Sequence, residues 1–297
     1  MNSVNRSYLY AGLTILFWAT SATAFKIALR HVDHVQLLFL ASLTSTLALL
    51  VVLLSQKRLK EALTITKSQL KWSAFLGFLN PFAYYFVLFI AYGLLPAQVA
   101  QPLNFIWPIA MVILSVPILG QHLSLRSFFA LILSFIGVVL ISSQGSFSVF
   151  AKSNPLGVAL AVGSSVIWAL FWLYNVRDSK RDEVVKLFWN FLVATVLCLG
   201  VGVFRPNFFS INLNGALASI YIGLFEMGFA FVLWLKALSY AKSTAKLGNI
   251  VFFVPFLSLI IIWIVLKEHI YWTTLAGLVV IVGSILYQRA GKAEPNS

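Results

Sequence analysis

The sequence predicts an all-α integral membrane protein. We expect ten transmembrane helices as two inverted five-helix repeats, with both termini cytoplasmic. Three observations lead to this prediction: the apolar composition, ten apolar runs of membrane-spanning length, and similarity between the two halves. Of the 297 residues, 61% are hydrophobic and 10% are charged, whereas soluble proteins have roughly 45–50% and about 25%. The composition therefore indicates that lipid surrounds most of the protein.

Ten segments are long and apolar enough to cross a bilayer, which takes about 20 residues per helix. They run approximately over residues 8–29, 35–55, 72–94, 97–119, 125–143, 155–174, 185–204, 217–238, 244–266 and 271–287. Several connections contain only a few residues, so neighbouring helices must be antiparallel and packed side by side. Strands are a poor alternative because the runs are continuous and lack period-two alternation.

The net charge of +13 reflects membrane topology. Lys and Arg residues gather in short gaps between the apolar runs and form no continuous basic face, so we expect no nucleic-acid binding. With the N-terminus inside the cell, 16 of the 21 Lys and Arg residues fall on the cytoplasmic side and 4 outside, while Lys26 lies within the first span. This asymmetry predicts a multi-pass protein of the cell (inner or plasma) membrane with both ends cytoplasmic.

The second half of the chain repeats the first. PIAMVILSVPILGQHLSLRSFFALILSFIG begins at Pro108, and PFLSLIIIWIVLKEHIYWTTLAGLVVIVGS begins at Pro255. An offset of 147 residues also pairs Gln121 with Glu268 and His122 with His269, and an offset of 150 pairs Trp18 with Trp168. Chance similarity between apolar segments is the alternative. Five spans per half is an odd number, so residues 1–150 and 151–297 would enter the membrane in opposite senses, as in many secondary transporters.

These repeats resemble those of the EamA-type drug/metabolite transporters. The resemblance covers nearly the whole chain and rests on the two proline-led segments above, on residues 223–238 and on the opening Phe17-Trp18-Ala19. It implies a helix bundle whose first, third, fourth, sixth, eighth and ninth helices surround a central cavity. It also implies export of amino acids, other small metabolites or drugs, driven by exchange or a proton gradient. Aromatic amino-acid exporters of the YddG type are the nearest functional model.

Two ionisable side chains lie well inside predicted spans, where they are costly and by default mark a functional cavity. Glu226, near the middle of the eighth span, could bind a proton or a substrate ammonium group, or could be satisfied by neighbouring hydroxyl groups or by Lys26. Lys26, toward the outer end of the first span, could bind a substrate carboxylate or pair with Glu226. Alternatively, its long stem could carry the ammonium group to the membrane interface.

Amide side chains beside prolines are further candidates. Gln101 and Asn104 lie one turn apart in the fourth span, with Pro108 on the same face. A proline there weakens the helix and favours a bend that lines a cavity. Asn80 beside Pro81 predicts a comparable break in the third span, and Asn249 with Pro255 does so in the ninth. Ordinary hydrogen bonding between helices is the alternative.

Indole side chains complete the candidate set. Trp18, Trp107, Trp168 and Trp234 lie deep in their spans and could stack on an apolar, aromatic or cationic substrate, although packing alone also accounts for them. Trp18 and Trp168 are the best candidates because they occupy equivalent positions in the two halves.

The sequence therefore predicts a secondary transporter that exports small amphipathic metabolites, amino acids first, by alternating access. Coupling to protons and coupling to exchange both stay open. The alternatives are drug or cation efflux, metabolite uptake, a channel, or a membrane sensor. No ATP-binding, metal-ligand or hydrolase motif appears, so we expect no enzyme activity, cofactor or metal. The expected partners are a small-molecule substrate, protons if coupled, and the bilayer; we expect a monomer, with an oligomer as the alternative.

Overall fold

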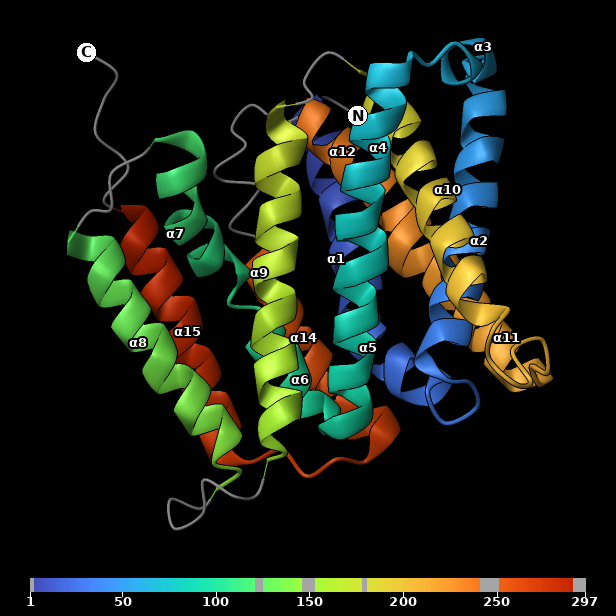
Figure 1. Ribbon diagram of the computed structural model, residues 1–297. Helices are drawn as coiled ribbons and strands as arrows, with labels where there is room; N and C mark the ends of the chain where they lie inside the picture. The colour runs from blue at the N-terminus through green and yellow to red at the C-terminus, as the bar shows by residue number, and fades with distance from the viewer. Residues whose placement is uncertain (1–2, 121–124, 146–152, 178–180, 241–250, 291–297) are drawn as a thin grey trace, which may run out of the picture.

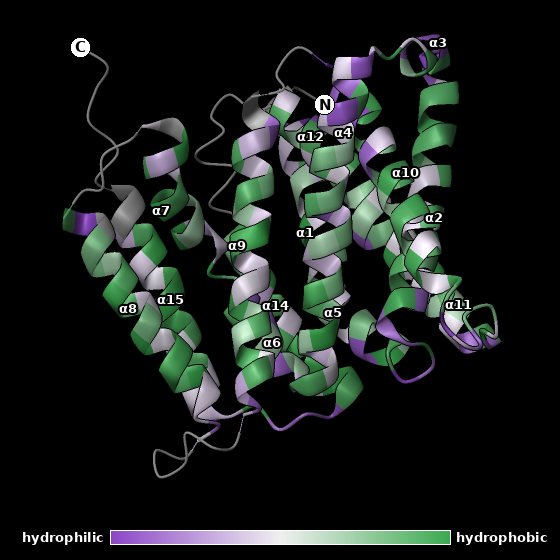
Figure 2. Ribbon diagram, viewed as in Figure 1, coloured by the Kyte–Doolittle hydropathy of each residue, from purple (hydrophilic) through white to green (hydrophobic). Residues whose placement is uncertain are grey.

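The computed structural model describes residues 3–120, 125–145, 153–177, 181–240 and 251–290. These described residues form helices, turns and short connections, and no strand. The all-α prediction is therefore confirmed for this part of the chain. Hydrophobic residues dominate the helices along most of their length, while hydrophilic residues gather toward the helix ends (Figure 2).

The helices follow one another with few intervening residues. In chain order they are α1 (Ser3–Ala28), α2 (His34–Ser55), α3 (Leu59–Leu63), α4 (Lys67–Gly77), η1 (Phe78–Ala83), α5 (Tyr84–Leu94), α6 (Ala97–Asn104), α7 (Trp107–Leu119), α8 (Leu125–Ser142), α9 (Pro155–Arg177), α10 (Glu183–Gly202), α11 (Leu213–Tyr221), η2 (Ile222–Gly228), α12 (Phe229–Tyr240), η3 (Val251–Phe253), α14 (Val254–Ile261), η4 (Ile262–Leu266) and α15 (Trp272–Ala290). The short α3 helix, between the second and third predicted spans, was not expected from the sequence.

Seven continuous helical segments of the described chain are long and apolar enough to cross a membrane. They are Asn5–Ala28, His34–Ser55, Lys67–Leu94, Ala97–Ile118, Pro155–Asn175, Glu183–Gly202 and Leu213–Tyr240. Three shorter apolar helices, Phe128–Ser142, Val251–Leu266 and Trp272–Tyr287, lie where the other three spans are predicted. Seven predicted spans thus coincide with long apolar helices, and the count of ten stays a prediction.

Several spans are interrupted. The third is broken as predicted: Asn80 leaves the helical conformation (φ −148°, ψ 122°) directly before Pro81, within the π-helical η1. The eighth contains the π-helical η2 between α11 and α12. The fourth span is also broken beside its proline. The break lies at residues 105–106, on the N-terminal side of Pro108, and Pro108 itself lies in the first turn of α7, where its missing N–H group costs no hydrogen bond.

The helices pack in pairs that relate the two halves of the chain. In Figure 1, α8 and α15 lie together at the left, α2 and α10 at the right, and α1, α5 and α9 between these pairs. Within the centre, α1 packs against α12 and α14, while α9 packs against α5 and against α6 and α7. The centre of the bundle is therefore formed by helices from both halves of the chain.

Glycine allows the closest of these pairs to form. A Cβ atom at Gly137 of α8 would lie 2.9 Å from the carbonyl oxygen of Gly277 of α15, and one at Gly277 would lie 2.6 Å from that of Gly137. Small residues at such contacts let helices approach closely in lipid. Ser134 and Ser284 extend the contact with a hydroxyl–hydroxyl hydrogen bond of 2.7 Å.

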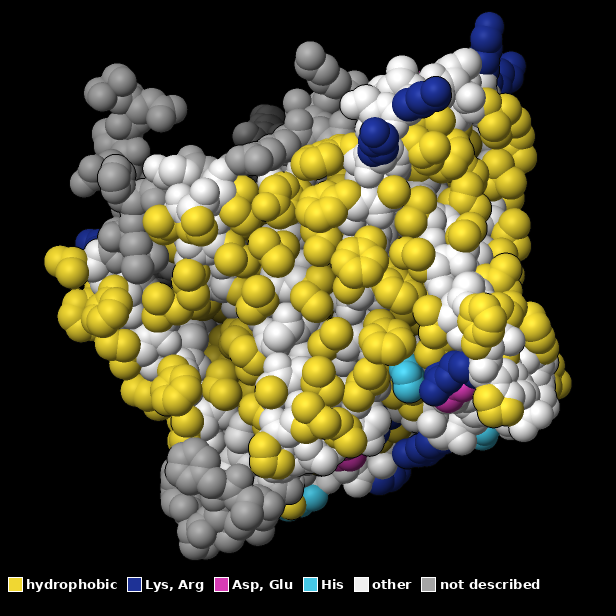
Figure 3. Space-filling model, viewed as in Figure 1, with side chains coloured by type: hydrophobic (Ala, Val, Ile, Leu, Met, Phe, Trp, Pro, Cys, Tyr) yellow, Lys and Arg dark blue, Asp and Glu magenta, His cyan; other side chains and the backbone are white. Residues whose placement is uncertain are grey.

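The outer surface is apolar where lipid is expected. Exposed large side chains are frequent on α8 and α15, where Phe135 is 69% exposed and Val279 is 59% exposed. Figure 3 shows hydrophobic side chains across the middle of one face, with Lys and Arg side chains mainly near its edges. We expect this surface to lie in the hydrocarbon of the bilayer, because large exposed apolar patches on soluble proteins promote association.

Candidate binding cavity

A cavity of about 300 Å³ lies among the interrupted helices. Its volume lies at the lower end of the range of small-molecule sites. Most of its lining side chains are aromatic or aliphatic, and Glu226 is the one charged side chain among the described residues that line it. The lining consists of Trp18, Ser21, Phe25, Tyr84, Leu88, Gln101, Asn104, Phe105, Trp107, Met111, Trp168, Trp172, Leu173, Glu226, Trp234, Val251, Phe252 and Val254.

Glu226 presents an incompletely satisfied carboxylate to this cavity. Its Oε1 accepts a hydrogen bond from the Tyr85 hydroxyl group at 3.2 Å. Its Oε2 is buried, and no described residue donates a hydrogen bond to it. The Ser21 hydroxyl group lies beside the carboxylate but donates to the carbonyl oxygen of Trp18 at 2.6 Å. An unpaired buried carboxylate oxygen is costly, so Oε2 is a ready acceptor for a ligand N–H group.

The π-helical turn η2 positions this carboxylate. A Cβ atom at Gly223 would lie 2.6 Å from the carbonyl oxygen of Ala41, so glycine is needed for η2 to approach α2 this closely. Ser45 of α2 then donates to the carbonyl oxygen of Gly223 at 2.8 Å. The wider turn also leaves the carbonyl oxygen of Glu226 in reach of the Trp18 indole N–H group, at 3.4 Å. Such π-helical turns often mark functional sites.

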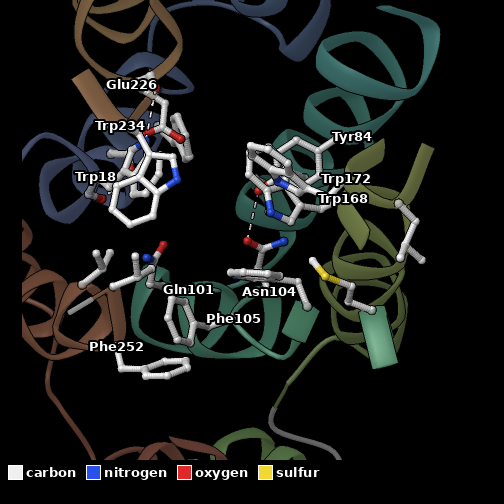
Figure 4. A pocket seen from close by; sticks show the side chains of 18 residues that line it. Trp18, Tyr84, Gln101, Asn104, Phe105, Trp168, Trp172, Glu226, Trp234 and Phe252 are labelled. Atoms are coloured by element: carbon white, nitrogen blue, oxygen red, sulfur yellow. Dashed lines mark hydrogen bonds between the residues drawn. The ribbon is translucent and has the colours of Figure 1, made fainter. Parts of the chain in front are cut away.

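Aromatic rings form two walls. Trp18 and Trp234 have ring centroids 5.6 Å apart. Facing them, Trp168 packs against Tyr84 at 4.6 Å and against Trp172 at 5.9 Å. Figure 4 shows the two groups on opposite sides, with Glu226 on the side of Trp18 and Trp234. Two parallel or tilted aromatic walls suit an apolar, aromatic or cationic ligand.

The remaining side holds amide groups and a phenylalanine pair. Asn104 accepts a hydrogen bond from the Tyr84 hydroxyl group at 3.1 Å and donates to the Ser164 hydroxyl group at 2.8 Å. Gln101 Oε1 accepts from the Tyr92 hydroxyl group at 2.5 Å. Phe105 and Phe252 meet edge to face with centroids 5.9 Å apart, and in Figure 4 both lie below Gln101. The break between α6 and α7 brings Asn104, Phe105 and Trp107 to the same cavity.

Seven of the ten candidate residues named from the sequence line this cavity. They are Glu226, Trp18, Trp168, Trp234, Asn104, Gln101 and Trp107. Asn80 is 1% exposed, and it lies in the helix break without lining the cavity. Asn249, like Gln121 and His122, lies outside the described residues.

Lys26 does not pair with Glu226. Its Nζ donates to the carbonyl oxygens of Tyr92 (2.8 Å) and Leu95 (3.0 Å), at the C-terminal end of α5. A cation there compensates the carbonyl groups that a helix end leaves unpaired. Lys26 lines a different cavity, of about 460 Å³, together with Glu268 and Gln98.

This second cavity contains a network that joins three helix ends. The carboxylate of Glu268 accepts hydrogen bonds from the backbone N–H groups of Ala97 (3.0 Å) and Gln98 (3.1 Å), at the start of α6. The Gln98 amide donates to the carbonyl oxygen of His269 and accepts from the Thr274 hydroxyl group at 3.3 Å. Lys26 thus binds carbonyl groups before the short turn between α5 and α6, and Glu268 binds N–H groups after it.

Several lining residues were not predicted from the sequence: Ser21, Phe25, Tyr84, Trp172, Phe105 and Phe252. The offset of 150 residues that pairs Trp18 with Trp168 also pairs Tyr84 with Trp234. This match in the sequence could have identified Tyr84 as a candidate. Phe105 and Phe252 are related by the shift of 147 residues that aligns the two proline segments. Abundant aromatic residues masked these matches, because the chain contains 26 Phe and 10 Tyr.

Comparison with known proteins gives consistent results. The sequence model of the EamA-like transporter family matches residues 5–143 and 155–288. The uncharacterised transporter YvbV of Bacillus subtilis is 26% identical over 97% of this chain and 93% of its own length. An uncharacterised transporter of Clostridium kluyveri is 24% identical over 97% and 95%.

Two further similarities concern function and fold separately. The aromatic amino acid exporter YddG of Ancylobacter novellus is 25% identical over 52% of this chain and 53% of its own. A protein of known crystal structure shares the fold with a TM-score of 0.67 at 22% identity, covering 97% of this chain and 99% of that chain.

Proposed function

The chain belongs to the EamA-like transporter family and is a multi-pass membrane transporter, and from this premise we propose that it exports small amphipathic metabolites by alternating access. Amino acids with an aromatic or apolar side chain are the proposed substrates. The central cavity is the proposed binding site. We propose that Glu226, Trp18, Trp168, Gln101, Asn104 and Trp107 contribute to it.

The observation that carries this proposal is the unpaired carboxylate oxygen of Glu226 beside two aromatic walls. A substrate ammonium group would supply the missing N–H donor to Oε2 and gain a charge-assisted hydrogen bond. Its apolar part would lie between Trp18 and Trp168, where indole faces also attract cations. The cavity of about 300 Å³ suits a ligand of the size of an aromatic amino acid.

The proposed mechanism uses two inverted repeats, residues 1–150 and 151–297. The helix contacts support it: when each helix of one half is replaced by its equivalent in the other half, the same pairs of helices are in contact. The pair of α1 with α12 then corresponds to that of α9 with α5, and the pairs of α2 with α10 and of α8 with α15 map onto themselves. Repeats related in this way can rock about a fixed central site. The distribution of Lys and Arg residues favours cytoplasmic termini.

Efflux of organic cations is the second candidate function. The observation in its favour is that no basic side chain lies among the described residues that line the central cavity, so a substrate carboxylate would find only neutral donors there. Amino acids and amines of the same skeleton differ only in that carboxylate, and the two functions can therefore be separated with matched compounds.

A counterflow screen in reconstituted vesicles tests the proposal. Vesicles loaded with one unlabelled compound at a time would receive a trace of the same labelled compound outside. Saturable accumulation of amino acids supports the first function, whereas accumulation of the corresponding amines alone supports the second. Passive equilibration with every compound would contradict a carrier and favour a channel. Repeating the assay with an imposed pH gradient distinguishes proton coupling from exchange.

A further inference from the structure

Two buried tyrosines of α5 hold the polar groups of the central cavity apart. Tyr85, 0% exposed, donates to Glu226, and Tyr92, 1% exposed, donates to Gln101. Positions seven residues apart share one helix face, and at 1.5 Å per residue they are about 10 Å apart along the axis. Glu226 and Gln101 are therefore held at two different levels of the cavity.

An apolar stretch separates these two levels. The ring of Phe25, which lines the cavity, packs edge-on against both tyrosines, with centroids 6.3 Å from Tyr85 and 5.2 Å from Tyr92. In Figure 4, Trp18 and Trp234 lie between Glu226 and Gln101. A ligand that reaches both polar groups must therefore pass an aromatic section.

Tyr92 also determines which end of the Gln101 amide faces the ligand. Because Oε1 accepts the phenolic proton, the amide nitrogen Nε2 is the group left to donate. Within the described part of the chain Nε2 donates to no protein group, whereas both polar atoms of the Asn104 amide are bonded, to Tyr84 and Ser164. Of the two amides, Gln101 alone has a nitrogen with no protein partner among the described residues.

We propose that Gln101 is a specificity-determining residue, donating from Nε2 to a hydrogen-bond acceptor at the end of the substrate remote from its ammonium group. Tyr92 is the positioning residue that orients the amide. This proposal rests on the proposed function, because it requires the ammonium group at Glu226. A ligand that reaches both groups would place an aromatic ring in the section lined by Phe25, Trp18 and Trp234, with its acceptor beyond that ring, at Gln101. The proposed substrate class is therefore phenolic amines and amino acids, such as tyramine and tyrosine.

Matched compounds that differ by one hydroxyl group test the proposal by counterflow: tyrosine against phenylalanine, and tyramine against phenethylamine. We expect the wild type to favour the phenolic member of at least one pair by about five- to tenfold, the contribution of one hydrogen bond to a neutral group. A ligand without the hydroxyl group leaves the N–H donor of Gln101 unpaired, and the site therefore discriminates against that ligand.

Two variants and one control separate recognition from folding. Gln101→Met keeps the approximate length of the side chain but offers neither an N–H donor nor an oxygen acceptor, so the phenolic preference should fall to about one. Tyr92→Phe frees the amide to turn and should reduce the preference several-fold. Tyr221→Phe, which removes a hydroxyl–hydroxyl hydrogen bond to Thr20, serves as the control, because neither residue lines the cavity, and should leave the ratio between the paired compounds unchanged.

The outcomes also distinguish this proposal from the proposed function. Equal counterflow of both members of each pair by the wild type, or an unchanged ratio in Gln101→Met, would overturn the role of Gln101 while leaving the carrier function intact. The absence of counterflow with all four compounds would overturn both.

Discussion

The indole ring of Trp168 packs against the phenol ring of Tyr84, with centroids 4.6 Å apart, and the same arrangement recurs 150 residues away. A shift of that length carries Tyr84 to Trp234 and relates Trp18 to Trp168, and the Trp18 and Trp234 rings are 5.6 Å apart. The two aromatic walls of the cavity are thus related by one shift in the sequence and lie on opposite sides, in agreement with the proposed site between two repeats.

Substitution of either wall should weaken substrate binding to a similar extent. Trp18→Leu and Trp168→Leu each remove one aromatic face, worth about 0.5–2 kcal/mol in stacking and cation–π attraction. We expect the apparent affinity in counterflow to fall about two- to thirtyfold. Trp263→Leu is the matched control, since Trp263 is 61% exposed on the outer surface. A loss confined to one wall, or a loss of the same size in the control, would contradict the two-sided site.

The α8–α15 contact should depend on its glycines. Gly277→Val places a side chain against the carbonyl oxygen of Gly137, so we expect destabilisation of about 1–3 kcal/mol from overpacking. Gly283→Val, six residues along the same helix, places the same side chain in open space and serves as the control. Thermal unfolding in detergent should show a lower Tm for the first variant only; equal Tm values would mean that the helices do not pack this closely.

The network around Glu268 should hold the turn between α5 and α6 in place. Glu268→Ala removes the acceptor of two backbone N–H groups, a change that costs about 0.5–2 kcal/mol at helix N-termini. We expect a cysteine at Gly93, where a Cβ atom meets nothing within 4 Å, to be labelled about fivefold faster in this variant, in a Cys198→Ser background. Glu61→Ala, which removes an exposed ion pair with Arg58, is the control and should leave the labelling rate at Gly93 unchanged.

The predicted orientation can be checked by labelling intact cells. In a Cys198→Ser background, a cysteine replacing Lys152 should react with a membrane-impermeant thiol reagent, and one replacing Lys60 should react only after the cells are opened. This follows from the excess of Lys and Arg on the side of the termini. The reverse pattern would invert the proposed topology, and equal labelling at both positions would contradict the predicted number of spans between them.

The sequence predicted the class of the fold because lipid imposes length and composition on every helix. Long apolar runs were therefore recognised individually, and Glu226 stood out because ionised side chains are rare in such runs. Helix interruptions were harder to place. Asn80 and Pro81 marked the break in the third span, but the π-helical η2 around Glu226 has no proline.

The partners of the polar residues could not be predicted from the sequence. Lys26 binds carbonyl oxygens at the end of α5, 66 and 69 residues away, and no periodicity encodes that contact. Tyr84, Tyr85 and Tyr92 were not singled out because aromatic residues are common throughout the spans. Their roles depend on which hydroxyl group meets Glu226, Asn104 or Gln101, and this requires the packing of α5 against its neighbours.

The most direct test of the central claim is counterflow of tyrosine and tyramine by wild-type protein and Glu226→Gln, reconstituted side by side. The amide retains the size of the side chain and an acceptor for Tyr85, but it cannot offer an anion to the substrate ammonium group. We predict saturable counterflow of at least one compound by the wild type and a loss of at least about tenfold in the variant, with both proteins showing the same Tm. Undiminished counterflow by Glu226→Gln would contradict the assignment of this cavity as the substrate-binding site.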